Sequence, residues 1–285
     1  MNRDIGEGLT RLRTLIRSYR SVLVAYSGGV DSALVAAVAR QELGDHSLAC
    51  IGVSASYPAR ERRDAVAFAM SIGVQYRLVE TGEQSDPRYT ANVGDRCYFC
   101  RADLFRRLRD IATVERWHAI ADGVHANDID DHVNGMRAAR AAGVRSPLLE
   151  AGLRKSDVRE AARQLGLSVW DKPAAACLAS RVPRGVQITP ALLAQIDAAE
   201  DVIAAMGFRE FRVRYHGDIA RLELPTKDFE RAVILREQIT AGLRAWGFRF
   251  VTLDLSGIGS NSVAADSVTP VTLVPLRLAS RIKDT

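Results

Sequence analysis

The segment Val22–Ser32, which reads VLVAYSGGVDS, constrains the 285-residue chain more than any other. Its apolar first half predicts a buried strand, the Ser-Gly-Gly-Val-Asp-Ser stretch predicts a tight turn, and a helix is expected from Ala33. Glycine lets an anion approach the main chain closely, and the first N–H groups of a helix point at the same place. The segment therefore predicts a phosphate-binding loop at the end of a strand.

The polar residues of this turn indicate which kind of phosphate site it forms. A carboxylate such as that of Asp31 repels a phosphate unless a divalent cation bridges the two, so the sequence predicts Mg²⁺. The Gly-x-x-x-x-Gly-Lys-Ser/Thr spacing of the kinase P-loop is missing. A glycine-rich turn without a ligand is the weaker alternative. The predicted phosphate-binding residues are Ser27, Gly28, Gly29, Val30, Asp31 and Ser32.

Length and composition narrow the class of protein. A chain of 285 residues is expected to form about two domains. Its contents of 47% hydrophobic and 26% charged residues are typical of soluble globular proteins. We find no signal-peptide pattern and no apolar run of membrane-spanning length, so we expect a cytoplasmic protein without a membrane partner. The net charge of +5 suits an anionic substrate but does not distinguish a nucleotide from RNA.

The first half of the chain alternates between strand and helix patterns. After the loop, strands are expected over 48–54, 74–80 and 118–123, with helices over 61–73 and 102–114 between them. This rhythm predicts an α/β fold, a Rossmann-like parallel sheet with helices on both faces. Ligands of such sheets bind at the carboxyl ends of the strands, where the phosphate loop also lies.

The second half changes pattern. A helix over 156–165 with Ser156 as its N-cap and a last short strand over 167–170 are expected to complete the sheet. Thr189-Pro190 then predicts a new helix start. The later elements, a helix over 191–206, strands over 211–215 and 219–224, a helix over 227–246 and a strand over 250–255, predict a smaller α+β domain. We place the domains at 1–187 and 188–285.

Cys97 and Cys100 form a Cys-x-x-Cys pair in front of the helix expected at 102–114. Sulfurs near the positive end of a helix are favoured as thiolates. The pair suits a redox site, half of a zinc site or part of an iron–sulfur site, and simple packing is a further alternative. No second Cys-x-x-Cys and no closely spaced histidine pair completes a zinc site, which makes zinc less favoured.

Cys177 stands alone in the sequence DKPAAACLASR, residues 171–181. It follows the strand expected at 167–170, so it is predicted to share the sheet edge of the phosphate loop. The neighbouring cations Lys172 and Arg181 favour a thiolate and hence a nucleophile. Packing as a small apolar residue is the weaker alternative, whereas Cys50 lies in an apolar run that suits packing.

Several segments together resemble a known family. The loop at 27–32 resembles that of the PP-loop ATP pyrophosphatases, which split ATP between its α- and β-phosphates. Within that superfamily, the chain resembles the LarE-type ATP-dependent sulfur transferases, which belong to the pathway that makes the nickel-pincer nucleotide of lactate racemase. The segments that carry the resemblance are 122–128, 143–148, 171–185 and 212–216.

The resemblance implies a two-step reaction. The enzyme adenylylates a carboxylate of pyridinium-3,5-biscarboxylic acid mononucleotide and releases pyrophosphate, and sulfur then displaces AMP to give a thiocarboxylate. In one branch of the family, cysteines at the positions of Cys97, Cys100 and Cys177 hold a [4Fe–4S] cluster with an exchangeable sulfide. In the other branch, the cysteine at position 177 donates its own sulfur and becomes dehydroalanine. This chain has all three cysteines, which favours the cluster.

The resemblance also implies roles for other residues and a homo-oligomeric assembly. Adenine is expected at the main chain of Ser54 and Ser56, and Asp128 is expected beside Mg²⁺ or the pyridinium ring. The residues expected to bind the substrate phosphate are Ser180, Arg181, Arg212 and Arg214, of which Arg212 and Arg214 share one strand face. The chain departs from the family pattern at Val124-His125 and Ile258-Gly259, and both departures concern the substrate pocket more than the ATP site. Glu200 suits either a structural role or a subunit contact.

Three other functions compete with sulfur transfer to a small nucleotide. A PP-loop tRNA thiolase shares the loop, but the cysteine-rich RNA-binding domain common in such enzymes is missing, so we expect no nucleic-acid partner. An amide-forming NAD or GMP synthetase leaves the three cysteines unexplained. A nonenzymatic nucleotide-binding module leaves Asp31 and the thiols without a role.

Overall fold

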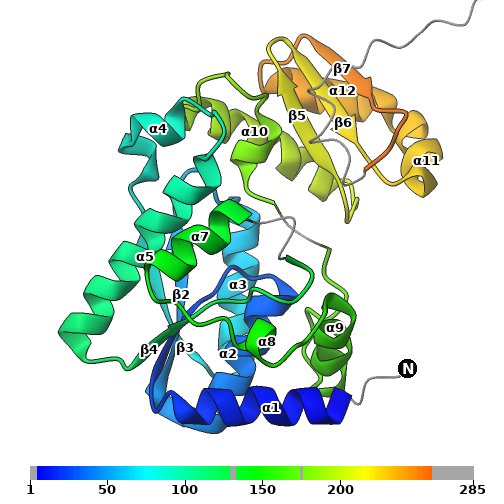
Figure 1. Cartoon of the computed structure of the whole chain (residues 1–285). Helices are drawn as coiled ribbons and strands as arrows, with labels where there is room; N and C mark the ends of the chain where they lie inside the picture. The colour runs from blue at the N-terminus through cyan, green and yellow to red at the C-terminus, as the bar shows by residue number, and fades with distance from the viewer. Residues whose placement is uncertain (1–4, 129–132, 174–175, 259–285) are drawn as a thin grey trace, which may run out of the picture.

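The computed structural model describes residues 5–128, 133–173 and 176–258 (Figure 1). It contains a four-stranded sheet in the first part of the chain and a three-stranded sheet in the second. The predicted Rossmann-like α/β fold with a smaller α+β unit is therefore confirmed. In the described part of the chain, no helix has the length and apolar character needed to cross a membrane.

The first sheet is parallel throughout and has the strand order β3-β2-β1-β4. Its strands match the predicted ones to within a few residues. They are β1 (Val22–Ala25), β2 (Ser47–Val53), β3 (Gln75–Glu80) and β4 (Ala119–Ala121). Because β1 pairs with both β2 and β4, the loops that follow these three strands meet at one edge of the sheet.

Helices cover both faces of this sheet, as predicted (Figure 1). Val22 and Val24 of β1 point into a core shared with four helices, whereas Leu23 between them points into a core shared with two others. The first set is α1 (Ile5–Ser18), α2 (Val30–Leu43), α3 (Ala59–Ser71) and α9 (Lys155–Gln164), and the second is α5 (Arg96–Glu115) and α7 (Val133–Ala141). The short helices α4 (Pro87–Thr90) and α8 (Pro147–Glu150) lie in connections.

One predicted helix start and one predicted N-cap are wrong. Helix α5 begins at Arg96, so Cys97 and Cys100 lie in its first turns rather than in front of it. Helix α9 begins after Arg154, whose N–H donates to Asp157 Oδ2 over 2.9 Å, and Ser156 lies inside the helix. The carboxylate of Asp157 satisfies a free N–H at the helix start, which is the role that the sequence assigned to Ser156.

The strand predicted over 167–170 is also wrong. The chain turns there, because Trp170 N–H donates to the carbonyl of Leu167 over 3.1 Å and Lys172 N–H donates to that of Val169 over 3.0 Å. These bonds use donors that a strand needs for its neighbour. The position beside β4 is taken instead by Arg145, which forms an isolated parallel bridge with Ala121. No strand therefore leads toward Cys177 within the described residues.

The second unit packs two long helical segments on one face of a sheet with the order β5-β6-β7. Thr189 caps the first helix by accepting from Leu192 N–H, as Thr189-Pro190 predicts. The helix predicted over 227–246 is broken at Leu235. The two residues before the break, Val233 and Ile234, are exposed and β-branched, and such residues are poor helix formers. The elements are α10 (Pro190–Ala205), β5 (Arg212–His216), β6 (Ile219–Glu223), α11 (Phe229–Ile234), α12 (Arg236–Ala245) and β7 (Phe250–Leu253).

A small apolar cluster joins the two units. It contains Leu178 and Val182 from before the predicted boundary at 187/188, and Leu193 and Ile196 of α10 from beyond it. Tyr89 of α4, which belongs to the first unit, is also part of this cluster. The short helical turn Leu178–Arg181 is thereby packed between the parallel sheet and the second unit.

Candidate functional site

The predicted phosphate loop lies between β1 and α2. Gly28 has a φ of +75°, and a Cβ there would lie 3.0 Å from Ala65 Cβ and 3.2 Å from Tyr57 Oη, so the position requires glycine. Ser32 Oγ lies 3.1 Å from Ser27 Oγ and accepts from Ser27 N–H over 3.1 Å. The two hydroxyls and the first turn of α2 thus surround one concave stretch of backbone. This arrangement suits a phosphate.

Asp31, in the first turn of α2, is held by a lysine that the sequence analysis missed. Lys155 Nζ lies 2.8 and 2.6 Å from the two carboxylate oxygens of Asp31. His125 Nε2 lies 3.7 Å from Asp31 Oδ1, and His125 N–H donates to Asp128 Oδ2 over 2.9 Å. Lys155 is the first residue of α9, where a cation opposes the helix dipole, and this unfavourable placement was the available sequence signal.

The four residues Asp31, His125, Asp128 and Lys155 form what we call the loop cluster. Its two carboxylates supply the oxygen ligands that Mg²⁺ prefers, beside the loop expected to hold the phosphates. The ammonium of Lys155 balances the charge of Asp31 and lies where it can also meet a phosphate. The donor set therefore fits a magnesium–nucleotide complex. Asp128 lies in the loop cluster. It does not lie among the arginines that were expected to bind the substrate.

Gly123, after β4, supports the loop from the opposite side. A Cβ at this position would lie 2.6 Å from Ser32 N and 3.0 Å from the carbonyl carbon of Asp31. Next to it, Asp122 accepts from Val124 N–H over 3.1 Å, and burial raises the pKa of its carboxyl. The end of β4 therefore packs directly against the first turn of α2.

We expect Gly123→Ala to damage the phosphate loop. The added methyl group must push the backbone of Asp31 and Ser32 away, which costs about 1–3 kcal/mol of folding free energy by the usual effect of overpacking. We expect a large loss in the rate of ATP–pyrophosphate exchange and only a modest loss in melting temperature, because the displaced atoms belong to the loop itself. An unchanged exchange rate in a folded variant would contradict this role of Gly123.

Ser54 and Ser56 follow β2 at the same sheet edge. Their hydroxyls lie 2.8 Å apart, and Ser56 Oγ donates to Glu83 Oε1 over 3.1 Å. The carbonyl of Ser56 accepts from Leu178 N–H over 2.9 Å. Cys177, which precedes Leu178, therefore lies at the carboxyl end of β2, on the predicted edge, although no strand leads there.

Cys100 and Cys177 both pack against the apolar cluster that joins the two units, and Cys97 lies one helical turn before Cys100 in α5. Cys97 is exposed, Cys100 and Cys177 are half-buried, and Cys50 is fully buried. Burial raises the pKa of the Cys100 thiol, and the charges of Glu83, Cys177 and Cys97 raise it further. The expected thiolate-favouring effect of the helix start is thus outweighed at Cys100. No group of three His, Cys, Asp or Glu side chains converges on a single metal position among the residues that the structure describes.

The cations expected beside Cys177 are engaged elsewhere. Lys172 Nζ lies 2.7 Å from Glu61 Oε2, and Arg181 Nε lies 2.8 Å from Glu200 Oε1. The ion pair between Arg181 and Glu200 is buried in the second unit, so Glu200 has a structural role in this chain. The prediction that these two cations act on the Cys177 thiol is therefore not supported by their contacts.

The four residues expected to bind the substrate phosphate are brought together around the Cys177 turn. Ser180 Oγ donates to the carbonyl of Cys177 over 2.8 Å, and Arg214 Nη1 donates to the carbonyl of Ser180 over 2.8 Å. Arg214 Nε lies 2.5 Å from Glu223 Oε1, and Arg212 Nη1 lies 3.7 Å from Glu223 Oε2, so the two arginines share one strand face as predicted.

These contacts give the arginines different tasks. Arg181 and Arg214 are buried against Glu200 and Glu223, and they hold the turn that carries Cys177. Arg212 lies farther from the Glu223 carboxylate than Arg214 does, and burial, followed by the charges of Arg181 and Arg214, lowers its pKa. Arg212 is thus the member best suited to an anionic ligand.

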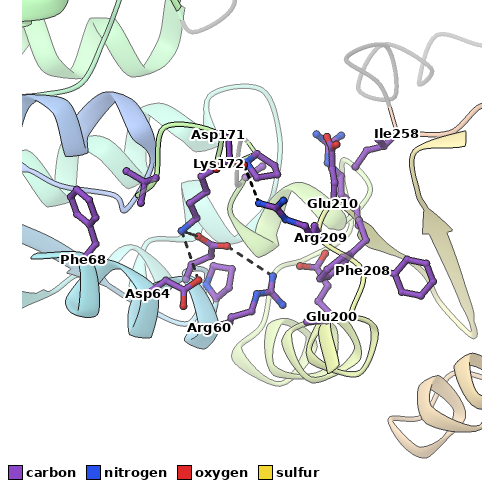
Figure 2. Close-up of a pocket in the computed structure, with 18 of the residues that line it drawn as sticks. Arg60, Asp64, Phe68, Asp171, Lys172, Glu200, Phe208, Arg209, Glu210 and Ile258 are labelled. Carbon is purple, nitrogen blue, oxygen red and sulfur yellow. Dashed lines mark hydrogen bonds and ion pairs between the residues drawn. The ribbon is translucent and has the colours of Figure 1, made fainter. Parts of the chain in front are cut away.

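A cavity of about 600 Å³ lies beside Arg212, between α3 and the second unit (Figure 2). Its wall includes Ala176, the neighbour of Cys177, and Ile258, one of the two departures from the family pattern; Gly259 lies outside the described residues. Arg60 and Arg209 also line it, and both are paired with carboxylates, Arg60 with Asp201 over 3.5 Å and Arg209 with Asp171 over 3.3 Å. The volume is in the range of small-molecule sites. Among the described wall residues are neither the phosphate loop nor the three cysteines.

Comparison with known proteins decides the family. A model of the NAD synthase family matches residues 11–116. The pyridinium-3,5-bisthiocarboxylic acid mononucleotide synthase of Lactiplantibacillus plantarum is 36% identical over 255 residues, which cover 88% of this chain and 92% of that protein. This chain belongs to the same, LarE-type family. An uncharacterized protein of Synechocystis is 40% identical over 90% of this chain and 96% of its own length.

The LarE-type assignment confirms the predicted resemblance and agrees with the architecture. The B subunit of the glutamine-hydrolyzing GMP synthase of Methanopyrus kandleri is 26% identical over 57% of this chain and 55% of that protein. The NAD synthase match ends at residue 116, before Lys155 and Cys177. The loop and Cys97 and Cys100 thus fall inside the part shared with that family model, whereas Cys177 falls in the part that the LarE-type relatives add. ATP use is consistent with both comparisons.

Proposed function

We propose that this LarE-type protein is an ATP-dependent sulfur transferase that acts on pyridinium-3,5-biscarboxylic acid mononucleotide. The observation that carries the proposal is the hydrogen bond from Leu178 N–H to the carbonyl of Ser56, which brings the Cys177 turn to the sheet edge of the phosphate loop. The name of the Lactiplantibacillus relative supports a thiocarboxylate product. The cavity beside Arg212 has the size of a small-molecule site, and Arg212 itself supplies a cation for an anionic, nucleotide-like substrate.

In the first step, a carboxylate oxygen of the substrate attacks the α-phosphorus of ATP. The new bond is O–P, the bond between the α- and β-phosphates breaks, and pyrophosphate leaves. The N–H groups at the start of α2 and the hydroxyls of Ser27 and Ser32 hold the phosphates. Asp31 and Asp128 would hold Mg²⁺, which neutralises phosphate charge when bound, and Lys155 adds a positive charge at the same place.

In the second step, sulfur attacks the acyl carbon of the adenylate. The C–S bond forms, the C–O bond to the phosphate breaks, and AMP leaves with its electron pair. Arg212 anchors the substrate phosphate, while Arg181, Arg214 and Ser180 fix the Cys177 turn.

Cys97, Cys100 and Cys177 would hold a [4Fe–4S] cluster. Cysteines of such a cluster bind different irons, so they need not converge on one point, and Cys100 and Cys177 already pack against the same apolar cluster. A cluster with three protein ligands supplies an iron with an open position for sulfide. The alternative donor is Cys177 itself: after its sulfur has bonded to the acyl carbon, a base removes the Cα proton of Cys177, the Cβ–S bond breaks, the thiocarboxylate leaves with the electron pair of that bond, and dehydroalanine remains.

The test is turnover of the anaerobically purified full chain with ATP, Mg²⁺ and the pyridinium acid, followed by mass spectrometry of product and protein. We expect a brown protein, a product with sulfur in place of one carboxylate oxygen, and loss of the iron–sulfur absorption in Cys97→Ala, Cys100→Ala and Cys177→Ala. A colourless protein whose Cys177 loses the mass of H₂S would establish the sacrificial route. Absence of any thiocarboxylate would refute the proposed function.

A further inference from the structure

Residues 54–57, which we call the linking segment, lie between the phosphate loop and the Cys177 turn. On the loop side, Tyr57 Oη lies 3.1 Å from the carbonyl oxygen of Ser27. On the sulfur side, the carbonyl of Ser56 accepts from Leu178 N–H over 2.9 Å. Adjacent residues of one short segment therefore contact the site of acid activation and the site of sulfur delivery.

The conformation of the linking segment depends on the side chain of Ser56. Its hydroxyl donates to Glu83 Oε1 over 3.1 Å and lies 2.8 Å from Ser54 Oγ, which in turn accepts from Ser56 N–H over 3.2 Å. Ser56 and Glu83 are 4% and 1% exposed. A hydrogen bond to a buried carboxylate is stronger than one between neutral groups, so Glu83 fixes Ser56 firmly.

Burial of the Glu83 side chain is unfavourable for folding, which indicates that this residue has a role other than stabilising the fold. Its Oε2 atom is buried and has no hydrogen-bond partner among the described residues. The hydrogen bond that Glu83 accepts from Ser56 therefore holds a segment that contacts both the phosphate loop and the Cys177 turn.

We propose that Ser56, held by Glu83, is a positioning residue that couples activation of the acid to sulfur delivery. This inference rests on the proposed function. When the linking segment is fixed, the acyl adenylate formed at the loop and the sulfur at the Cys177 turn stay at one distance and orientation from each other. With the segment loosened, water competes for the adenylate: a water oxygen bonds to the acyl carbon, the C–O bond to the phosphate breaks, and AMP and the original carboxylate are released.

The coupling is measured as AMP released per thiocarboxylate formed. Ser56→Ala removes the hydroxyl but keeps the main-chain contact to Leu178, and a small misplacement of reacting groups is costly, so we expect this ratio to rise about tenfold or more. Glu83→Gln and Tyr57→Phe should raise it in the same direction. The matched control is Ser47→Ala, at the other end of β2, where a buried hydroxyl donates only to the carbonyl of Gly44 over 2.7 Å. Its ratio should equal that of the wild type.

The outcomes separate the inference from the function on which it rests. If the wild type forms no thiocarboxylate, the proposed function fails. If the wild type forms it and Ser56→Ala keeps the wild-type ratio, or lowers AMP and thiocarboxylate equally, the coupling role is refuted and the function stands. If Ser56→Ala does not fold, an unchanged ratio in both Glu83→Gln and Tyr57→Phe refutes the coupling role in the same way.

Discussion

Cys177→Ser should abolish thiocarboxylate formation and leave ATP–pyrophosphate exchange in place. The substitution removes the sulfur but keeps the turn, because the contacts of Ser56 and Ser180 with this turn go to its main chain. A hydroxyl is a far poorer nucleophile and iron ligand than a thiol, so we expect product to fall at least about 1,000-fold. Mass spectrometry of the product and exchange of labelled pyrophosphate into ATP measure the two steps separately.

Cys50→Ala is the matched control for this experiment. Cys50 is fully buried in β2, and burial raises the pKa of its thiol to about 12, so it remains a neutral packing group. Its loss should leave both steps intact. Normal thiocarboxylate yield from Cys177→Ser would rule out Cys177 as part of the sulfur donor.

Asp31→Asn should abolish both steps. Asparagine has the same shape but lacks the charge that pairs with Lys155 and that would bind Mg²⁺, and removal of one electrostatic contact to a transferring phosphoryl group costs about 100-fold or more. Pyrophosphate exchange should therefore fall with thiocarboxylate formation. This pattern differs from that of Cys177→Ser, in which exchange persists.

Asp45→Asn is the control carboxylate, just beyond the other end of α2. Asp45 is exposed and pairs with Arg40 over 2.6 Å, and such surface pairs contribute little. Its substitution should change neither step. Pyrophosphate exchange at the wild-type rate in Asp31→Asn would place the magnesium–nucleotide complex elsewhere.

Local sequence patterns predicted the elements whose stability is local. The strand, turn and helix of residues 22–43 follow from an apolar run, two glycines and a helical pattern, and the structure contains all three. Thr189-Pro190 likewise marks a helix start by its own side chain and ring. The wrong strand at 167–170 shows the limit, because four residues carry no periodicity that separates a strand from a turn.

No local pattern showed which residues of the site contact each other. Lys155 is 124 positions from Asp31, Glu83 is 27 positions from Ser56, and both contacts form only when separate loops meet at one sheet edge. Glycine is needed at position 123 because a Cβ there would collide with the backbone at the start of α2, and not because of the conformation of its own turn. Contacts of this kind depend on strand order, which a sequence does not display.

The sequence alone predicted a loop for phosphate and three cysteines suited to sulfur chemistry, and it determined the LarE-type character that the comparison confirms. This was possible because glycine conformation, helix starts and thiol chemistry depend on single residues and on their neighbours in the sequence. The tertiary structure decided which groups meet: Lys155 with Asp31, Arg181 with Glu200, and Leu178 with Ser56. The first and third pairings arise from the parallel order β3-β2-β1-β4, which brings distant loops to one edge, whereas Arg181 meets Glu200 where the Cys177 turn packs on α10 and burial strengthens the contact.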